Sequence, residues 1–265
     1  MLGALHLVGC AASAPGVVPD GLTAELVQLR GDLSVDRVQV HLENDSDEPV
    51  TVTGLTLSSP AFTAVAQWDG ESTVLQPGRA VNLPVFLPPL SCAASAEVTM
   101  AATFDDGAGA RAASTPLVDE LGALPRLVEA ECARERTEAV ARVTAVAAAT
   151  HADGTARVSL EIEPVADAVG TVRLVGVRGT PLLRFPGTEQ WPLGLTLDGS
   201  STPRVVEVPV EPRRCDPHAI AEDKVGTRLT LVVEIDGEEL AFPLPRTEGL
   251  ADTLLTYVAA SCGLT

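Results

Sequence analysis

The sequence predicts a mainly β protein built from two tandem, antiparallel β-sandwich domains, each with a short C-terminal helix. Three observations predict this class: the second half of the chain repeats the first, apolar and polar residues alternate in short runs, and turn-forming stretches separate the runs. The chain has 265 residues, of which 46% are hydrophobic, so it has enough apolar material for two cores of ordinary domain size.

The repeat has an offset of 123 residues, and several residues hold the same register in both copies. The matching positions are Gln67–Trp68 with Gln190–Trp191, Phe62 with Phe185, Pro89 with Pro212, and Cys92 with Cys215. The chain contains no other Trp, so the coincidence indicates duplication and assigns both Trp to the cores. We therefore divide the chain into residues 1–20 (signal and tether), 21–136 (first sandwich) and 137–265 (second sandwich).

Alternating apolar residues predict the strands of the first repeat. The runs are Val38, Val40 and Leu42; Val50, Val52, Leu55 and Leu57; Val81, Leu83, Val85 and Leu87; and Val98, Met100 and Ala102. The turn-forming sequences NDSDEP, WDGES, QPGR and DDGAG separate these runs, and THADGT, LDGSSTP and IDGEE take the same role in the second half. Such a pattern is typical of antiparallel sheets with one buried face. Pro84 and Pro209 lie inside such runs, which indicates edge strands or bulges.

Each repeat ends in a segment with helical periodicity. In the first repeat this segment is LPRLVEAECARE, at 124–135. In the second repeat Thr247 is the expected N-cap, and Leu250, Leu254, Leu255 and Val258 share one face of the expected helix.

These elements together resemble the immunoglobulin-like sandwich over about 240 residues. The likeness is to the class only, because a true immunoglobulin domain has its Trp between two Cys, whereas here each Trp precedes both Cys of its repeat. The stretch RCDPHAIAEDKVGT, followed by a hairpin and YVAASCG, is similar to uncharacterised exported lipoprotein-like proteins of actinobacteria. That resemblance covers mainly the second half and implies no known activity.

The N-terminus, MLGALHLVGC, predicts export and lipid attachment. Leu7-Val8-Gly9-Cys10 resembles the bacterial lipobox, in which Cys10 receives the lipid and the preceding peptide is removed. The stretch departs from a standard signal because it has no Lys or Arg and only nine residues before Cys10; a start site further upstream would explain both. The alternative is a buried N-terminal strand with an ordinary Cys. With the lipobox, we expect an extracytoplasmic protein anchored to the outer face of the cell membrane.

The five cysteines support the same compartment. Without Cys10, two remain in each repeat, and the equivalent positions pair as Cys92–Cys132 and Cys215–Cys262. Each bridge would tie a terminal helix to its sandwich and add up to about 4 kcal/mol in the chain-entropy model. Disulfides persist outside the cytoplasm. The alternative pairing, Cys92–Cys215 with Cys132–Cys262, would link the two repeats.

The stretch RRCDPHAIAEDKVGT, at 213–227, has the densest set of candidate chemical groups. A nucleophilic pair of Cys215 and His218, oriented by Asp216 or Asp223, is one hypothesis. The repeat argues against it, because Cys92 is equivalent to Cys215 and has no His beside it.

A metal site formed by Asp216, His218, Glu222 and Asp223 is a second hypothesis for this stretch. A structural interpretation competes with it, in which Asp216 caps a short helix that begins at a proline. His218 and Lys224 would then form an interaction surface, and Lys224 is the only lysine of the chain.

The net charge, the aromatic content and the absence of catalytic motifs exclude several classes of function. The net charge of −18 repels nucleic acid, and the 3% aromatic content disfavours a sugar-binding surface. The sequence contains no nucleophile elbow, zinc-protease motif, phosphate loop or dinucleotide fingerprint. We therefore expect a non-enzymatic envelope protein without a cofactor. Its role would be binding or scaffolding, with a protein partner held at a strand edge or in the groove between the domains.

Overall fold

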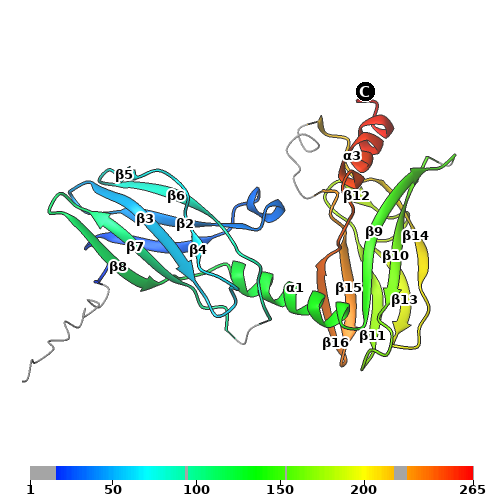
Figure 1. Cartoon of the computed structure of the whole chain (residues 1–265). Helices are drawn as coiled ribbons and strands as arrows, with labels where there is room; N and C mark the ends of the chain where they lie inside the picture. Colours follow the sequence, from blue (N-terminus) through cyan, green and yellow to red (C-terminus); the bar gives the residue numbers. More distant parts are fainter. Residues whose placement is uncertain (1–15, 93–94, 153, 218–225, 265) are drawn as a thin grey trace, which may run out of the picture.

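The computed structural model describes residues 16–92, 95–152, 154–217 and 226–264, which fold into two β-sandwiches joined by a helix (Figure 1). The fold class is the predicted one: mainly β, antiparallel and immunoglobulin-like, with a short helix at the end of each sandwich. The first sandwich is blue to green and the second is green to red in Figure 1.

The first sandwich has two facing sheets. One sheet has the order β1-β2-β6, from β1 (Leu22–Val27), β2 (Arg37–Asn44) and β6 (Arg79–Phe86). The other has the order β4-β3-β7-β8, from β4 (Ala66–Gln67), β3 (Val50–Ser58), β7 (Thr99–Asp105) and β8 (Ala110–Pro116), and β5 (Thr73–Leu75) also pairs with β3. A single 3-10 turn, η1 (Asp32–Ser34), separates β1 from β2.

The second sandwich repeats this order. One sheet is β9-β10-β14-β12, from β9 (Ala141–Thr150), β10 (Ala156–Pro164), β14 (Arg204–Pro212) and β12 (Leu183–Arg184). The other is β13-β11-β15-β16, from β13 (Gln190–Leu197), β11 (Val172–Arg178), β15 (Thr230–Ile235) and β16 (Glu238–Pro243). Even the irregularity recurs, because the register shifts at Gly54 of β3 and at Gly176 of β11. At Gly176 a Cβ atom would lie 2.6 Å from the Trp191 carbonyl oxygen.

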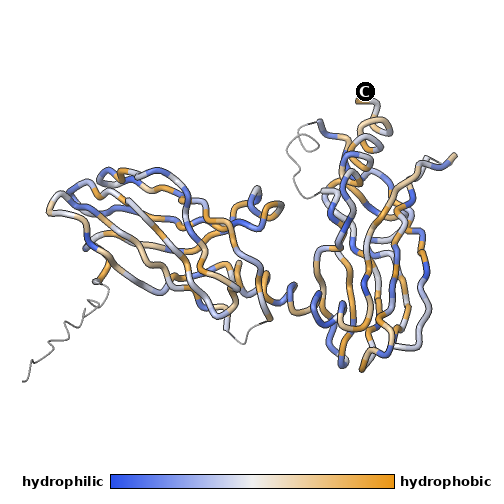
Figure 2. Tube along the Cα trace, in the orientation of Figure 1, coloured by the Kyte–Doolittle hydropathy of each residue, from blue (hydrophilic) through white to orange (hydrophobic). Residues whose placement is uncertain are grey.

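Alternation along the strands builds two cores, as the alternating hydropathy in Figure 2 shows. Val38, Val40 and Leu42 of β2 are fully buried in the first core. Trp68 and Trp191 are partly buried, each against the core of its own sandwich. Pro84 lies on β6, an edge strand, as predicted. Pro209 lies on β14, which is neither an edge strand nor bulged, but on the part of β14 that pairs with β10 alone and that β12 does not reach.

The helices are α1 (Ala123–Glu138) and α3 (Leu250–Ser261). The predicted N-cap Thr247 is wrong: the cap position of α3 is Gly249, whose φ of 78° suits glycine. Thr247 is instead held by β9, because its N–H donates to the Ala145 carbonyl at 3.0 Å and its hydroxyl donates to the Val146 carbonyl at 2.8 Å. Tertiary pairing therefore outweighs the local capping preference of Thr247.

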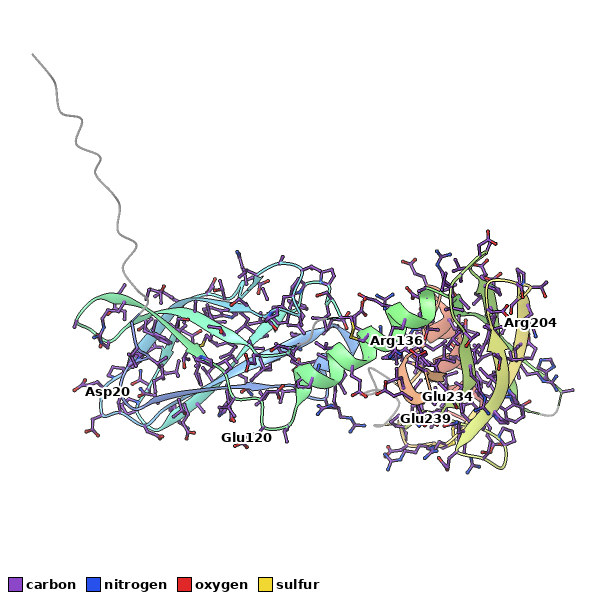
Figure 3. All side chains as sticks on the ribbon, turned by 90° about the horizontal axis from the view of Figure 1, so that it is seen from below. Asp20, Glu120, Arg136, Arg204, Glu234 and Glu239 are labelled. Atoms are coloured by element: carbon purple, nitrogen blue, oxygen red, sulfur yellow. A yellow bond between two sulfur atoms is a disulfide. The ribbon has the colours of Figure 1, made fainter. Side chains whose placement is uncertain are left out.

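Helix α1 belongs to both sandwiches. Leu124 and Val128 are buried in the first core, whereas Ala133, one turn further on, is buried in the second. Arg136, at the end of α1 nearest the second sandwich in Figure 3, lies 2.9 Å from the Asp236 carboxylate and 3.6 Å from that of Glu238. One continuous helix therefore connects the two domains without a flexible linker.

Candidate functional site

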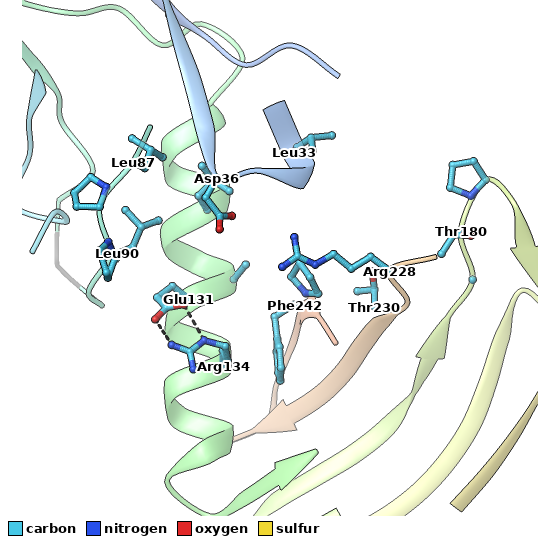
Figure 4. A pocket seen from close by; sticks show the side chains of 17 residues that line it. Leu33, Asp36, Leu87, Leu90, Glu131, Arg134, Thr180, Arg228, Thr230 and Phe242 are labelled. Carbon is cyan, nitrogen blue, oxygen red and sulfur yellow. Dashed lines mark hydrogen bonds and ion pairs between the residues drawn. The ribbon is translucent and has the colours of Figure 1, made fainter. Parts of the chain in front are cut away.

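A cleft of about 700 Å³ lies between the two sandwiches, and α1 forms its floor (Figure 4). Leu127, Ala130, Glu131 and Arg134 follow one face of α1 toward the cleft. The first sandwich contributes residues 33, 36 and 87–90, and the second contributes residues 179–181, 228, 230, 242 and 243. The volume lies within the roughly 300–1,000 Å³ that is typical of ligand sites. This interdomain cleft is the candidate functional site.

The η1 side of the cleft is fixed by a buried carboxylate. Asp32 is fully buried, and it accepts hydrogen bonds from the Leu29 N–H at 2.8 Å, the Arg37 Nε at 2.6 Å and the Gln39 Nε2 at 2.9 Å. The anchored turn presents Leu33 to the cleft with 44% of its surface exposed. The carboxylate of this turn is thus held inside the sandwich, and Leu33 contributes aliphatic surface to the wall of the cleft.

The Leu87–Leu90 side of the cleft is held to the helical floor. The Leu87 N–H donates to the Asp36 carbonyl at 2.8 Å, and the Pro89 carbonyl accepts from the N–H of Thr63 at 3.1 Å. The Cys92–Cys132 disulfide then joins the end of this segment to α1. This bridge and Cys215–Cys262 are the two pairs that the repeat predicts.

The wall from the second sandwich is also ordered. The Thr180 hydroxyl donates to the Gly226 carbonyl and accepts from the N–H groups of Leu182 and Leu183, at 3.2 and 2.9 Å. Phe242, which is 3% exposed, closes the base of this wall. Both walls are thus preformed, as is usual for ligand sites.

Two charged residues, Arg228 and Asp36, line the cleft, and neither forms an ion pair with another residue of the described ranges. Arg228 of the second sandwich is partly buried, and it makes no hydrogen bond or ion pair with any residue of the described parts of the chain. Figure 4 shows its side chain extending toward α1 and Asp36 of the first sandwich. Burial and the adjacent charge of Arg228 lower the pKa of Arg246 from its usual value. Among the residues that the structure describes, no carboxylate therefore pairs with the positive charge of Arg228 on this wall.

The remaining charges of the floor neutralise one another. Arg134 forms ion pairs with both Glu131 and Glu138, at spacings of three and four residues along α1. The hydrogen bonds that Arg134 donates to the carboxylates of Glu131 and Glu138 raise the pKa of its guanidinium. Arg134 is therefore held in place along the floor and is already occupied.

The predicted 213–227 site is described only in part. Cys215 is bonded to Cys262, so it has no thiol to act as a nucleophile in this form, and Asp216 is exposed. His218, Glu222, Asp223 and Lys224 lie outside the described residues, as does the proposed lipidation site Cys10. Within the described ranges no three His, Cys, Asp or Glu side chains gather closely enough to hold a metal ion. The metal hypothesis at Asp216, His218 and Asp223 thus stays a prediction, and elemental analysis of the purified protein would test it.

Sequence reasoning anticipated a groove between the domains but not its residues. The lining comes from segments that are far apart in the sequence, and none of them has a recognisable motif. The one sequence feature that could have indicated the cleft is the pattern of α1. Leu124 and Val128 form one apolar face of this helix, and Ala130 and Ala133 form another. Two apolar faces on one helix indicate that it packs on two bodies.

Comparisons with known proteins support no family assignment. No protein-family model matches the chain, and no curated protein sequence matches it. Similar solved structures include the YadV chaperone (12% identity, TM-score 0.25, covering 84% of this chain and 98% of that one) and a FixG-related protein from Vibrio parahaemolyticus (13%, 0.24, 38% and 99%). The exo-chitosanase CsxA of Amycolatopsis orientalis also aligns (10%, 0.22, 84% and 26%). At these scores the likenesses carry no functional inference. In the described part of the chain, neither helix is long and apolar enough to cross a membrane.

Proposed function

We propose that this chain is an exported, lipid-anchored cell-envelope protein that binds another envelope protein in its interdomain cleft without catalysing a reaction. The observation that carries the proposal is the cleft itself, whose floor and walls are fixed by a shared helix, a disulfide and a buried carboxylate. A preformed, largely apolar site with a few placed charges is suited to recognition. The two disulfides support an oxidising compartment outside the cytoplasm.

The position of the N-terminus is consistent with such an anchor. Gly16, the first described residue, pairs with β8 on the first sandwich, where its N–H donates to the Ala112 carbonyl at 3.0 Å. The chain therefore enters the first sandwich on the side away from the second one (Figure 1). A lipid on Cys10 would hold the first sandwich nearest the membrane and direct the cleft toward other envelope components.

Lipid attachment is tested by changing Cys10→Ser in the full chain and labelling cells with an alkyne fatty acid. We expect labelling and membrane recovery of the parent chain, and loss of both in the variant, because the thiol carries the lipid. Equal labelling of the two chains would contradict the anchor.

Binding in the cleft is tested by photocrosslinking in cells that produce the full chain. A benzophenone amino acid replaces Leu33, which is exposed at the cleft, and a control replaces Val169, which is 96% exposed. We expect a defined crosslinked envelope protein at Leu33 and none at Val169. The same products at both positions, or none at either, would overturn the proposed function.

A further inference from the structure

We propose that the cleft binds a short, extended protein segment through its aliphatic side chains, with an acidic group of that segment paired to Arg228. This inference deepens the proposed binding function and rests on it. It names the chemistry of the partner at the cleft, which the proposed function leaves open.

The lining favours aliphatic contact over main-chain pairing. Pro88, Pro89, Pro181 and Pro243 are all part of the lining, and a proline has no N–H to donate to an added strand. Leu33 and Leu127 supply aliphatic surface on the wall and the floor. A bound segment would therefore be held mainly by burial of its side chains, because few backbone donors of the lining can reach it.

The charges of the cleft specify an acidic partner group at one place. Arg134 is already bound by two glutamates, whereas Arg228 has no ion-pair partner among the described residues. A guanidinium can bind a carboxylate through two parallel hydrogen bonds, and partial burial strengthens that contact relative to an exposed pair. Asp36 faces the same space from the opposite wall, so the cleft presents both signs of charge.

A cleft with aliphatic surface and charged residues of both signs fits a protein segment better than a sugar or an acyl chain. Phe242 is the one aromatic residue among the described lining residues, and it is buried, so the cleft offers no stacking platform for a sugar ring. An acyl chain would leave Arg228 and Asp36 without a partner at the walls. A peptide supplies aliphatic groups and charges within one short length.

The test is selection of peptides from a phage-displayed library of random decapeptides on the full, oxidised chain. Three targets are compared: the parent chain, Arg228→Glu, and Arg204→Glu as the control. Arg204 is an exposed arginine on β14 that does not line the cleft, and Figure 3 shows it on the side of the second sandwich that faces away from the first. We expect an aliphatic consensus that contains Asp or Glu on the parent and on Arg204→Glu, and replacement of the acid by Lys or Arg on Arg228→Glu.

Affinity measurements complete the test. The selected peptide should bind Arg228→Gln about tenfold more weakly than the parent in fluorescence anisotropy, because a hydrogen bond to a charged group is lost. Arg204→Gln should bind it within about twofold of the parent. Thermal melts of each variant check that it remains folded.

Two results would overturn the inference. A consensus without an acid, or one unchanged by Arg228→Glu, would remove the role of Arg228. If no peptide is selected but an envelope protein still crosslinks at Leu33, the partner does not bind as a short extended segment. The proposed function would then remain, and only this inference would be rejected. Failure of both experiments would remove the proposed function as well.

Discussion

The two sandwiches share the order of their main strands, the position of their disulfide and a C-terminal helix, apart from β5 in the first and β12 in the second. Their helices nevertheless make different contacts. Helix α1 is shared between two cores and forms the floor of the cleft. Helix α3 packs only on its own sandwich, with Leu250, Leu254 and Val258 in the second core. The difference shows that a duplicated element becomes a connector when it acquires a second apolar face.

The chain provides a built-in probe of this comparison, because each sandwich has one tryptophan. Trp68 packs against the first core and Trp191 against the second. Replacing one of them by Phe leaves a fluorescence signal that reports on the unfolding of the other sandwich. Denaturation in the Trp68→Phe and Trp191→Phe backgrounds therefore follows the second and the first sandwich separately.

The largest change in the free energy of unfolding is expected at the buried leucines of the two helices. Leu124→Ala and Leu254→Ala each remove a side chain that is at most 1% exposed, so each should lower the free energy of unfolding by about 2–5 kcal/mol. We expect Leu124→Ala also to weaken binding in the cleft, because it loosens the floor, whereas Leu254→Ala should not. Urea denaturation and crosslinking at Leu33 measure the two effects. Equal crosslinking in the two variants would show that α1 does not determine the geometry of the cleft.

The two disulfides should separate stability from domain arrangement. Changing both cysteines of either pair to Ser should destabilise the corresponding sandwich by about 2–4 kcal/mol, since the sequence separations of 40 and 47 are similar. Only the Cys92–Cys132 bridge joins α1 to the segment that follows the cleft residues 87–90, whereas Cys215–Cys262 lies at the end of α3. We therefore expect the radius of gyration from small-angle X-ray scattering to rise for that pair alone, and a rise for both pairs would contradict the connector role.

A smaller effect is expected at the buried carboxylate of the first sandwich. Asp32→Ala removes the acceptor for Leu29, Arg37 and Gln39, and it should cost about 2–3 kcal/mol. The value is below that of a fully buried pair because the Arg37 side chain is 30% exposed and partly screened by solvent. Denaturation followed by the first-sandwich tryptophan measures it. Asp47→Ala, at an exposed bend of the same sandwich, is the control and should change stability much less.

The smallest effect is expected at the ion pairs between α1 and the second sandwich. Arg136 pairs with Asp236 and Glu238, whose side chains are 86% and 64% exposed. Arg136→Ala should therefore lower stability by less than about 1 kcal/mol, and by even less in high salt. Unfolding curves at two salt concentrations would show this. A large, salt-independent loss would mean that these charges, rather than apolar packing, join the domains.

The sandwiches were predictable because a period of two fixes which strand residues are buried. Val38, Val40 and Leu42 show this, and the equivalence of Cys92 with Cys215 sufficed to predict both disulfides. Thr247 was predicted wrongly because its backbone pairs with β9, a contact that local sequence does not reveal.

The cleft was less predictable for a related reason. Its geometry depends on how α1 packs on two bodies, and this packing brings together Leu33, Arg228 and Phe242 from distant parts of the chain. Asp32 was equally hidden, because nothing in the sequence distinguishes one buried acid among 36 acidic residues. Residues whose role depends on tertiary placement were thus the ones that pattern reasoning missed.

The disulfides also bear on mechanical load. If the chain is held at its N-terminus and pulled through a partner in the cleft, tension passes from the first sandwich into α1. The Cys92–Cys132 disulfide then carries the tension directly, because residues 93–131 lie inside the loop that it closes. Strands β7 and β8 lie in this loop, so they cannot be extended even if they detach from the sheet. The cross-link would keep that part of the first sandwich short under forces that unfold the strands before it.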